Sequence, residues 1–134
     1  MSFETALRAR VKALPEVVSA ASSVDWSVRP QGAFTSAIVL TVAYDPRGRT
    51  MTGWQGWIPT RVYIDVMAAS APVKAALRDA ILALIGVEAV AADARFWPAR
   101  DVSITDLSEQ ADTQFIHRDQ IDAIIPHMQE TDNG

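Results

Sequence analysis

The chain has 134 residues, a length typical of one domain, and its 49% hydrophobic and 21% charged residues are ordinary for a globular protein. It contains no cysteine, which excludes disulfides, thiolate nucleophiles and the usual structural zinc sites. The net charge of −4 argues against a general nucleic-acid binder. The sequence has no apolar run that could cross a membrane, so we expect the protein to fold in the cytoplasm and to have no membrane partner.

The first predicted element is a helix over residues 2–21. Its apolar side chains recur every three or four residues and form one stripe: Phe3, Leu7, Val11, Leu14 and Val18. Pro15 lacks a backbone donor, so it predicts a break near Leu14 and a second short turn after it. Three basic side chains lie off the stripe, and we expect them to face solvent or a partner: Arg8, Arg10 and Lys12.

Two strands are predicted next. Residues 24–29 alternate between apolar and polar side chains and end at Pro30. Residues 36–44 are apolar on both faces, which is typical of a central strand. The sequence DPRGR at 45–49 then predicts a turn.

A third strand and a second main helix follow. Residues 57–68 alternate strongly, and Ser70 and Pro72 are typical of a capped helix start. Gly86 suits the left-handed position that ends many helices. The predicted buried stripe of this helix is Val73, Leu77, Ala80, Ile81 and Leu84. We expect a core formed by Ile38, Leu40, Val42, Val62, Ile64 and Val66 and covered by Leu7, Val11, Leu77, Ile81 and Leu84.

The C-terminal third is less regular. Residues 95–106 contain strand-like pieces around Phe96 and Val102, with Pro98 between them. Residues 108–114 are predicted to be a polar loop. Residues 115–128 fit either a helix or a strand, and Pro126 would interrupt a helix but is tolerable in an edge strand. We expect residues 129–134 to be a disordered tail.

This order of elements predicts an α+β fold in a single domain spanning residues 1–128. We expect a largely antiparallel, mixed sheet of four or five strands, with two main helices packed on one face.

The search for catalytic residues favours no enzyme, no cofactor and no metal. His117 and His127 are the only histidines, and His117 stands in the sequence HRDQID beside Asp119 and Asp122. A small hydrolase or metal enzyme using His117 and Asp119 is one interpretation. The favoured interpretation is a polar face or turn near the C-terminus. The sequence also has neither a glycine-rich phosphate loop nor a serine nucleophile elbow, which argues against other enzyme classes.

The connector at residues 50–61 combines glycines with tryptophans in the sequence GWQGW. Trp54 and Trp57 either cap the open end of the core or form an anchor that is buried when subunits meet. The arginines Arg47, Arg49 and Arg61 mark either a solvated hairpin end or a contact with acids of a neighbouring subunit. Glycine makes this backbone costly to order, so we expect the connector to become ordered on assembly.

Two segments carry a resemblance to a known family. The run RPQGAFTSAIVLTVAYD, and after a loop GWQGWIPTRVYIDVMAASAPVKAALRDAILALIG, resembles the tail-completion, or tail-terminator, proteins of long-tailed bacteriophages and gene transfer agents. The matching features include Pro30 before the first long strand, the R-V-x-I-D-V strand at Arg61–Val66 and the amphipathic helix at Val73–Ile85. A final strand led by an aromatic residue and a His-Arg pair corresponds to Phe115, His117 and Arg118.

The resemblance implies a structural protein of the virion tail, assembled in the bacterial host cytoplasm. Its subunits would form a homo-oligomeric ring, typically of six, that caps the head-proximal end of the tail tube and stops tube polymerisation. The expected partners are the tail-tube protein and the head-tail connector protein, with DNA only passing through the channel. The expected interface residues are Arg47, Arg49, Trp54, Gln55, Trp57, Arg61, Phe96 and Trp97. The alternative is a small ferredoxin-like binding or regulatory domain, monomeric or dimeric.

Overall fold

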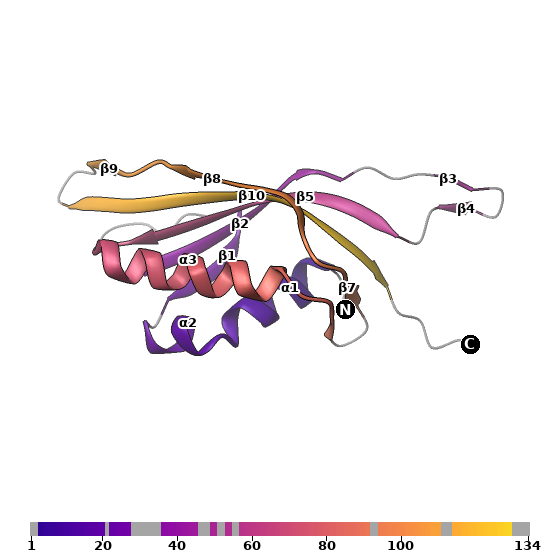
Figure 1. Ribbon diagram of the computed structural model, residues 1–134, viewed down its shortest axis with the longest axis horizontal. Helices are drawn as coiled ribbons and strands as arrows, with labels where there is room; N and C mark the ends of the chain where they lie inside the picture. The colour runs from indigo at the N-terminus through magenta and orange to yellow at the C-terminus, as the bar shows by residue number, and fades with distance from the viewer. Residues whose placement is uncertain are drawn as a thin grey trace.

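The computed structural model describes residues 3–20, 22–27, 36–45, 49–50, 53–54, 57–91, 94–110 and 114–129. Within these ranges, three helices lie on one face of an eight-stranded sheet (Figure 1). The helices are α1 (Phe3–Lys12), α2 (Pro15–Ser19) and α3 (Ala71–Ile85). The strands are β1 (Ser23–Trp26), β2 (Ser36–Tyr44), β3 (Arg49–Thr50), β4 (Gly53–Trp54), β5 (Ile58–Ala68), β6 (Ala89–Ala91), β7 (Ala94–Phe96), β8 (Arg100–Asp106), β9 (Glu109–Gln110) and β10 (Phe115–Gln129).

The main sheet has the strand order β1-β2-β5-β10-β7-β6, and β8 and β9 also pair with β10. The β1–β2 pair is parallel and the other pairs are antiparallel. The predicted α+β class and largely antiparallel sheet with helices on one face are confirmed. The predicted number of strands is too low, because β6, β7 and β9 are too short to show an alternating pattern.

The ambiguous segment 115–128 is a strand, and it lies inside the sheet rather than at its edge. β10 pairs with β5 along one side and with β7, β8 and β9 along the other. Pro126 lies directly opposite Pro59 of β5, and its carbonyl accepts a hydrogen bond from the Trp97 amide at 2.9 Å. In an antiparallel strand the N and C=O of one residue point to the same side, so the β5–β10 ladder needs no donor from either proline.

The first predicted helix is divided in two, as Pro15 predicts. α1 ends at Lys12 and α2 begins at Pro15, so the helical phase restarts after the break. For this reason Val17 is buried at 2% exposure, whereas Val18, predicted to continue the stripe, is 66% exposed.

Two arginines of α1 also differ from the prediction, which had them face solvent or a partner. Arg8 donates a hydrogen bond to the carbonyl of Val24 at 2.6 Å. Arg10 donates to the carbonyl of Leu84 at 3.1 Å and lies over the Phe96 ring at 4.6 Å. Burial lowers the pKa of Arg10. Both side chains therefore bind α1 to its own subunit, because their long stems reach carbonyls that the sequence does not place nearby.

Helix α3 begins as predicted, with the Ser70 hydroxyl accepting a hydrogen bond from the Val73 amide at 3.4 Å. Its buried residues are Lys74, Leu77, Ile81 and Ile85, so the predicted stripe is rotated, and Leu84 is only partly buried. Gly86 follows the helix with φ of −82°, which corrects the predicted left-handed position.

The core lies between the helices and the sheet. Of the predicted members only Val42 and Leu84 are partly exposed, and the others are buried. The core also contains residues that the prediction did not include: Phe3, Ala6, Val17, Val24, Ile85, Ala94, Phe96, Ile121, Ala123 and Ile125. A smaller cluster lies on the opposite face of the sheet: Ala37, Val39, Met67 and Ile116.

Other predicted boundaries also change. The strand expected at 24–29 is observed at 23–26, and residues 28–30 lie outside the described part. The predicted loop at 108–114 contains β9, which pairs with the start of β10. Strand β10 includes residue 129 of the predicted tail, and residues 130–134 are not described. The helices that are described are too short or too polar to cross a membrane.

Candidate assembly surface

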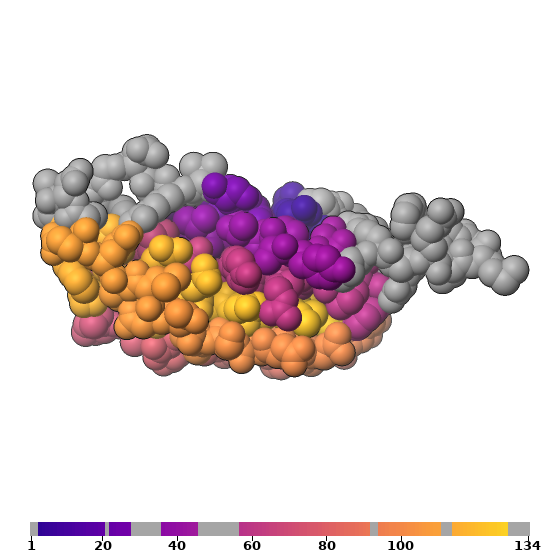
Figure 2. All heavy atoms as spheres, turned by 90° about the horizontal axis from the view of Figure 1, so that it is seen from above, coloured from indigo at the N-terminus to yellow at the C-terminus, as the bar shows by residue number. Residues whose placement is uncertain are grey.

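The face of the sheet that points away from the helices is called here the open face. Figure 2 looks onto it and shows side chains of β2 (purple), β5 (magenta), β10 (yellow) and β8 (orange) in adjacent rows. Successive strand residues point to opposite faces, so the core positions Ile64 and Ile121 alternate with open-face positions such as Asp65 and Asp122. The open face is therefore a second surface of the sheet that no described helix covers.

An ionic cluster centred on Asp65 lies on this face. Arg118 of β10 donates to Oδ1 of Asp65 from Nε at 3.0 Å and from Nη2 at 2.8 Å. The side-chain amide of Gln120 donates to the same oxygen at 3.3 Å. Asp65 is only 8% exposed, so its charge needs these donors. The cluster joins β5 to β10 through side chains as well as backbone.

A second ion pair on the same two strands involves a predicted interface residue. Nη1 of Arg61 lies 2.7 Å from Oδ1 of Asp122. Both side chains are about one third exposed, at 34% and 29%, so the pair contributes little to stability. Arg61 is thus oriented within its own subunit, and its remaining surface is on the open face.

Two of the predicted tryptophans flank the end of β10. Trp57 precedes Ile58, which pairs with His127, and Trp97 donates its amide hydrogen to Pro126 on the other side of β10. Each indole is partly exposed and has a guanidinium over its ring. Arg100 lies 5.4 Å from the centre of Trp57, and Arg95 lies 5.6 Å from the centre of Trp97.

These two tryptophan–arginine pairs are called here the aromatic end. Tryptophan and arginine contribute strongly to the binding energy of many protein interfaces. Tryptophan buries a large area with few flexible bonds, and arginine offers several preorganised hydrogen-bond donors. Cation–π contact also holds each ring in one orientation. Arg95 is fixed further by an ion pair with Glu88 at 2.7 Å. The aromatic end therefore presents two partly exposed indole rings, each with an arginine of the same chain over it.

The remaining predicted interface residues have different positions. Phe96 is fully buried beneath Arg10, so in this subunit it has no surface to offer a neighbour. Arg49 and Trp54 form a backbone pair of the β3–β4 ribbon. Arg47 and Gln55 lie outside the described residues.

His127 is held in the core by an aromatic ring and a hydroxyl group. His127 is 5% exposed, stacks on Phe3 with ring centres 3.8 Å apart, and hydrogen-bonds through Nε2 to the Thr60 hydroxyl at 2.7 Å. Thr60 in turn donates to Asp45 at 2.9 Å. Because this hydroxyl gives its proton to Asp45, Nε2 of His127 is the donor in the other bond. This geometry is that of a satisfied buried histidine.

The side chains of His117 and Asp119 contact different partners. The His117 ring meets the edge of Phe115 with ring centres 4.9 Å apart. Asp119 is occupied by two cations of α3, Lys74 at 3.2 Å and Arg78 at 2.9 Å. In the part of the chain that is described, no three His, Asp or Glu side chains gather as metal ligands.

The ion pairs of Asp119 with α3 were not predicted from the sequence, and Asp119 is only 3% exposed. A lysine and an arginine four residues apart, at 74 and 78, mark one face of the helix, and that spacing was the available signal. Hydrogen bonds and charge from Asp79 and then Asp119 raise the pKa of Arg78.

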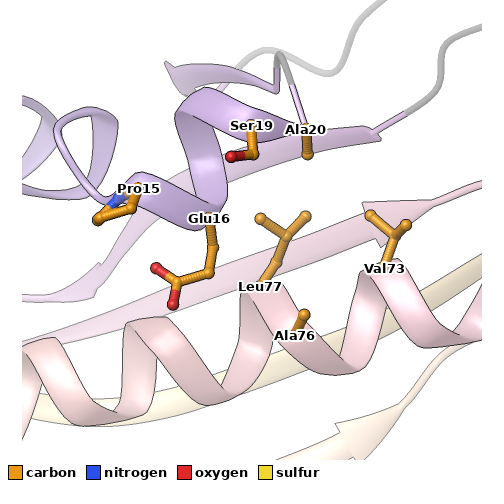
Figure 3. A pocket seen from close by; sticks show the side chains of 7 residues that line it. All are labelled: Pro15, Glu16, Ser19, Ala20, Val73, Ala76 and Leu77. Atoms are coloured by element: carbon orange, nitrogen blue, oxygen red, sulfur yellow. The ribbon is translucent and has the colours of Figure 1, made fainter.

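A shallow hollow of about 400 Å³ lies on the helical side of the molecule, between α2 and α3. Figure 3 shows Leu77 and Val73 of α3 facing the hollow, with Glu16 and Ser19 of α2 across from them. Its lining is mainly apolar, with the Glu16 carboxylate as the charged group. The Ser19 hydroxyl and the Glu16 carboxylate both line the hollow, and no hydrogen bond joins them.

Comparison with known proteins shows a similarity of fold. The chain superposes on a chain of a solved structure described as "Virion of native gene transfer agent (GTA) particle", with a TM-score of 0.60. The match covers 97% of this chain and 96% of that chain, at 14% sequence identity. No protein-family model matches the sequence. No curated protein matches it in sequence either.

Proposed function

We propose that this chain is a structural protein of a phage-like virion, and specifically a tail terminator that forms a ring on the head-proximal end of the tail tube. The observation that carries the proposal is the fold similarity to a gene transfer agent virion chain over nearly the full length of both chains. An isolated shared motif would leave the rest of the molecule unexplained, whereas this similarity includes every layer of the fold.

The surfaces of the subunit support a role in assembly. The open face and the aromatic end offer charged and aromatic groups that are already oriented by neighbours in the same chain. Preorganised side chains lose less entropy on binding, so they are effective contact residues. We propose Trp57, Arg61 and Trp97 as interface residues, together with Trp54 and Gln55 of the connector and Arg47 and Arg49 of the turn before it.

A closed ring requires two different patches on each subunit, because its contacts are head-to-tail. The β3–β4 ribbon is one candidate patch, and the aromatic end together with β8, which begins at Arg100 over the Trp57 ring, is the other. A structural role also fits the polar groups described above, which are satisfied within the fold rather than aimed at a shared cavity. We therefore propose no catalytic activity and no cofactor.

The element order does not favour the ferredoxin-like alternative. That fold alternates strand-helix-strand with strand-helix-strand, whereas here both α1 and α2 precede the first strand. We propose the virion tail as the location and the tail-tube and connector proteins as partners.

The direct test is the mass and shape of the assembled protein. Light scattering at high concentration, and again with purified tail-tube protein, should detect a ring of about 88 kDa, six times the 14.6 kDa subunit. Electron microscopy of polymerising tube protein should then show shorter tubes with one capped end when the chain is added. A strict monomer in both light-scattering conditions, with tubes of unchanged length, would contradict the proposal.

A further inference from the structure

The outer edge of β8 is an unpaired strand edge in the described part of the chain. β8 pairs with β10 along one side, and no other described strand pairs with it. All seven of its residues are exposed. An edge of this kind presents free N–H and C=O groups that another strand can bind.

The sequence of this edge favours strand addition. Residues 102–105 read VSIT, a stretch without charge in which Val102 and Ile104 are 43% and 45% exposed. Most free edges are protected by lysine, proline or a bulge. The bulge of β8 lies near Asp101, whose φ is 52°, and from Ser103 onward the register with β10 is regular. The apolar middle of the edge therefore lacks these protections.

The β3–β4 ribbon has the complementary property. β3 and β4 pair with each other in a separate two-stranded sheet and with no strand of the main sheet. Figure 1 places them at the opposite end of the long axis from β9, beyond the helical layer. A two-stranded ribbon by itself is only marginally stable in water, so it gains by adding to a larger sheet.

The charges of the two segments are also complementary. β8 carries Asp101 and Asp106, and β9 adds Glu109, against one arginine at Arg100. β3 carries Arg49, and neither β3 nor β4 contains an acid. Opposite charges of this kind set the register and the choice of partner when strands pair.

We propose that the β8 edge of one subunit binds the β3–β4 ribbon of the next copy of the chain, which extends the sheet from subunit to subunit. The inference rests on the proposed ring and supplies its head-to-tail contact. Because the ribbon and the edge lie at different places on one subunit, the contact is heterologous, and it closes only as a ring or continues as a filament.

Crosslinking tests the contact directly, because the native chain has no cysteine to interfere. Two single-cysteine proteins, Thr50→Cys on β3 and Ser103→Cys on β8, are mixed and treated with a short bismaleimide. The matched control replaces Ser103→Cys by Val90→Cys, an exposed position on the short strand β6. Light scattering of each mixture before crosslinking records the oligomeric state.

The expected result is a covalent dimer in the 50/103 mixture and little in the 50/90 mixture. A ring by light scattering without the 50/103 crosslink would overturn this inference while the proposed function stands. A strong Ser103→Cys crosslink to itself would overturn it in favour of two-fold edge pairing. A monomer in every mixture would reject the proposed ring and the inference together.

A second variant tests the β8 edge without chemical crosslinking. Ile104→Lys places a charge in the apolar middle of the edge at an exposed site, and we expect it to weaken each contact by about tenfold. Val90→Lys is the matched control and should leave assembly unchanged. Equal assembly of both variants, with folding verified by circular dichroism, would contradict the proposed contact.

Discussion

Lys74 of α3 places its ammonium nitrogen 3.2 Å from Oδ1 of Asp119 on β10, and both residues are less than 10% exposed. Arg78, one helical turn later, binds the other carboxylate oxygen at 2.9 Å. The pair explains why a lysine belongs to the buried stripe of α3. It also fixes the rotation of the helix on the sheet.

Asp119→Asn should therefore lower the free energy of unfolding by about 3–5 kcal/mol, because it leaves the buried Lys74 charge without its closest partner. Asp122→Asn is the matched control on the same strand. Its partner Arg61 is about one third exposed, so the loss there should stay within about 1 kcal/mol. Urea unfolding of both variants measures the difference, and equal losses would contradict this account.

Truncation of the core should be costly on both sides of the helix–sheet contact. Ile64 and Leu77 are 0% and 1% exposed, so Ile64→Ala and Leu77→Ala should each destabilise the protein by about 2–5 kcal/mol. Val90→Ala, at a site that is 58% exposed, should change stability by less than about 0.5 kcal/mol. Unchanged urea midpoints for the two core variants would show that the core is assigned wrongly.

The aromatic end should matter for assembly more than for folding. Trp57→Ala and Trp97→Ala should each weaken the ring contact by about 2 kcal/mol or more if the rings are buried there as anchors. Phe115→Ala removes another exposed aromatic side chain, at the start of β10, and serves as the control. Analytical ultracentrifugation over a range of concentrations measures the effect, and three indistinguishable profiles would argue against an interface at this end.

Asp106 should titrate below the ordinary value of its residue type. Hydrogen bonds from Ser108, first from its side chain and then from its backbone amide, lower the pKa of the Asp106 carboxyl below the usual 3.8. A lowered folded-state pKa contributes stability that is present above 3.8 and is lost as the pH falls through the lower value.

NMR titration of the carboxyl carbon should show the Asp106 pKa rising toward its ordinary value in Ser108→Ala. Ser103→Ala removes another serine hydroxyl, on β8 itself, that does not contribute to this shift, and should leave the pKa of Asp106 in place. A pKa that is the same in both variants and in the native protein would remove Ser108 as the cause.

The protein should purify without bound metal. His127 uses Nε2 for Thr60 and packs its ring on Phe3, and Asp119 is neutralised by α3, so neither is available as a ligand without a rearrangement. Elemental analysis of protein prepared without added metal should find less than one zinc or manganese per chain. A stoichiometric metal would contradict the structural role proposed for these residues.

Sequence alone was sufficient where local chemistry decides the outcome. The alternating residues of β2 and β5 specify strands because one face of each is apolar at every second position. Pro15 specifies the break between α1 and α2, and Ser70 specifies the start of α3, because a missing donor and a capping hydroxyl act within one helical turn. Among the described residues, the same local patterns predicted nine of the nineteen buried residues of the main core cluster.

Tertiary structure decided what depends on partners distant in the chain. Segment 115–129 carries both periodicities, and it is a strand because β5 and β8 supply hydrogen bonds on its two sides. From the sequence alone Lys74 is expected on the surface, because lysine is charged. In the structure Asp119, 45 positions away in sequence, provides the opposite charge that makes burial of Lys74 favourable. Phe96 was expected at an interface, but Arg10 of α1 covers its ring. In each case a hydrophobicity pattern records only how a residue relates to its near neighbours, whereas burial depends on which distant group completes its environment.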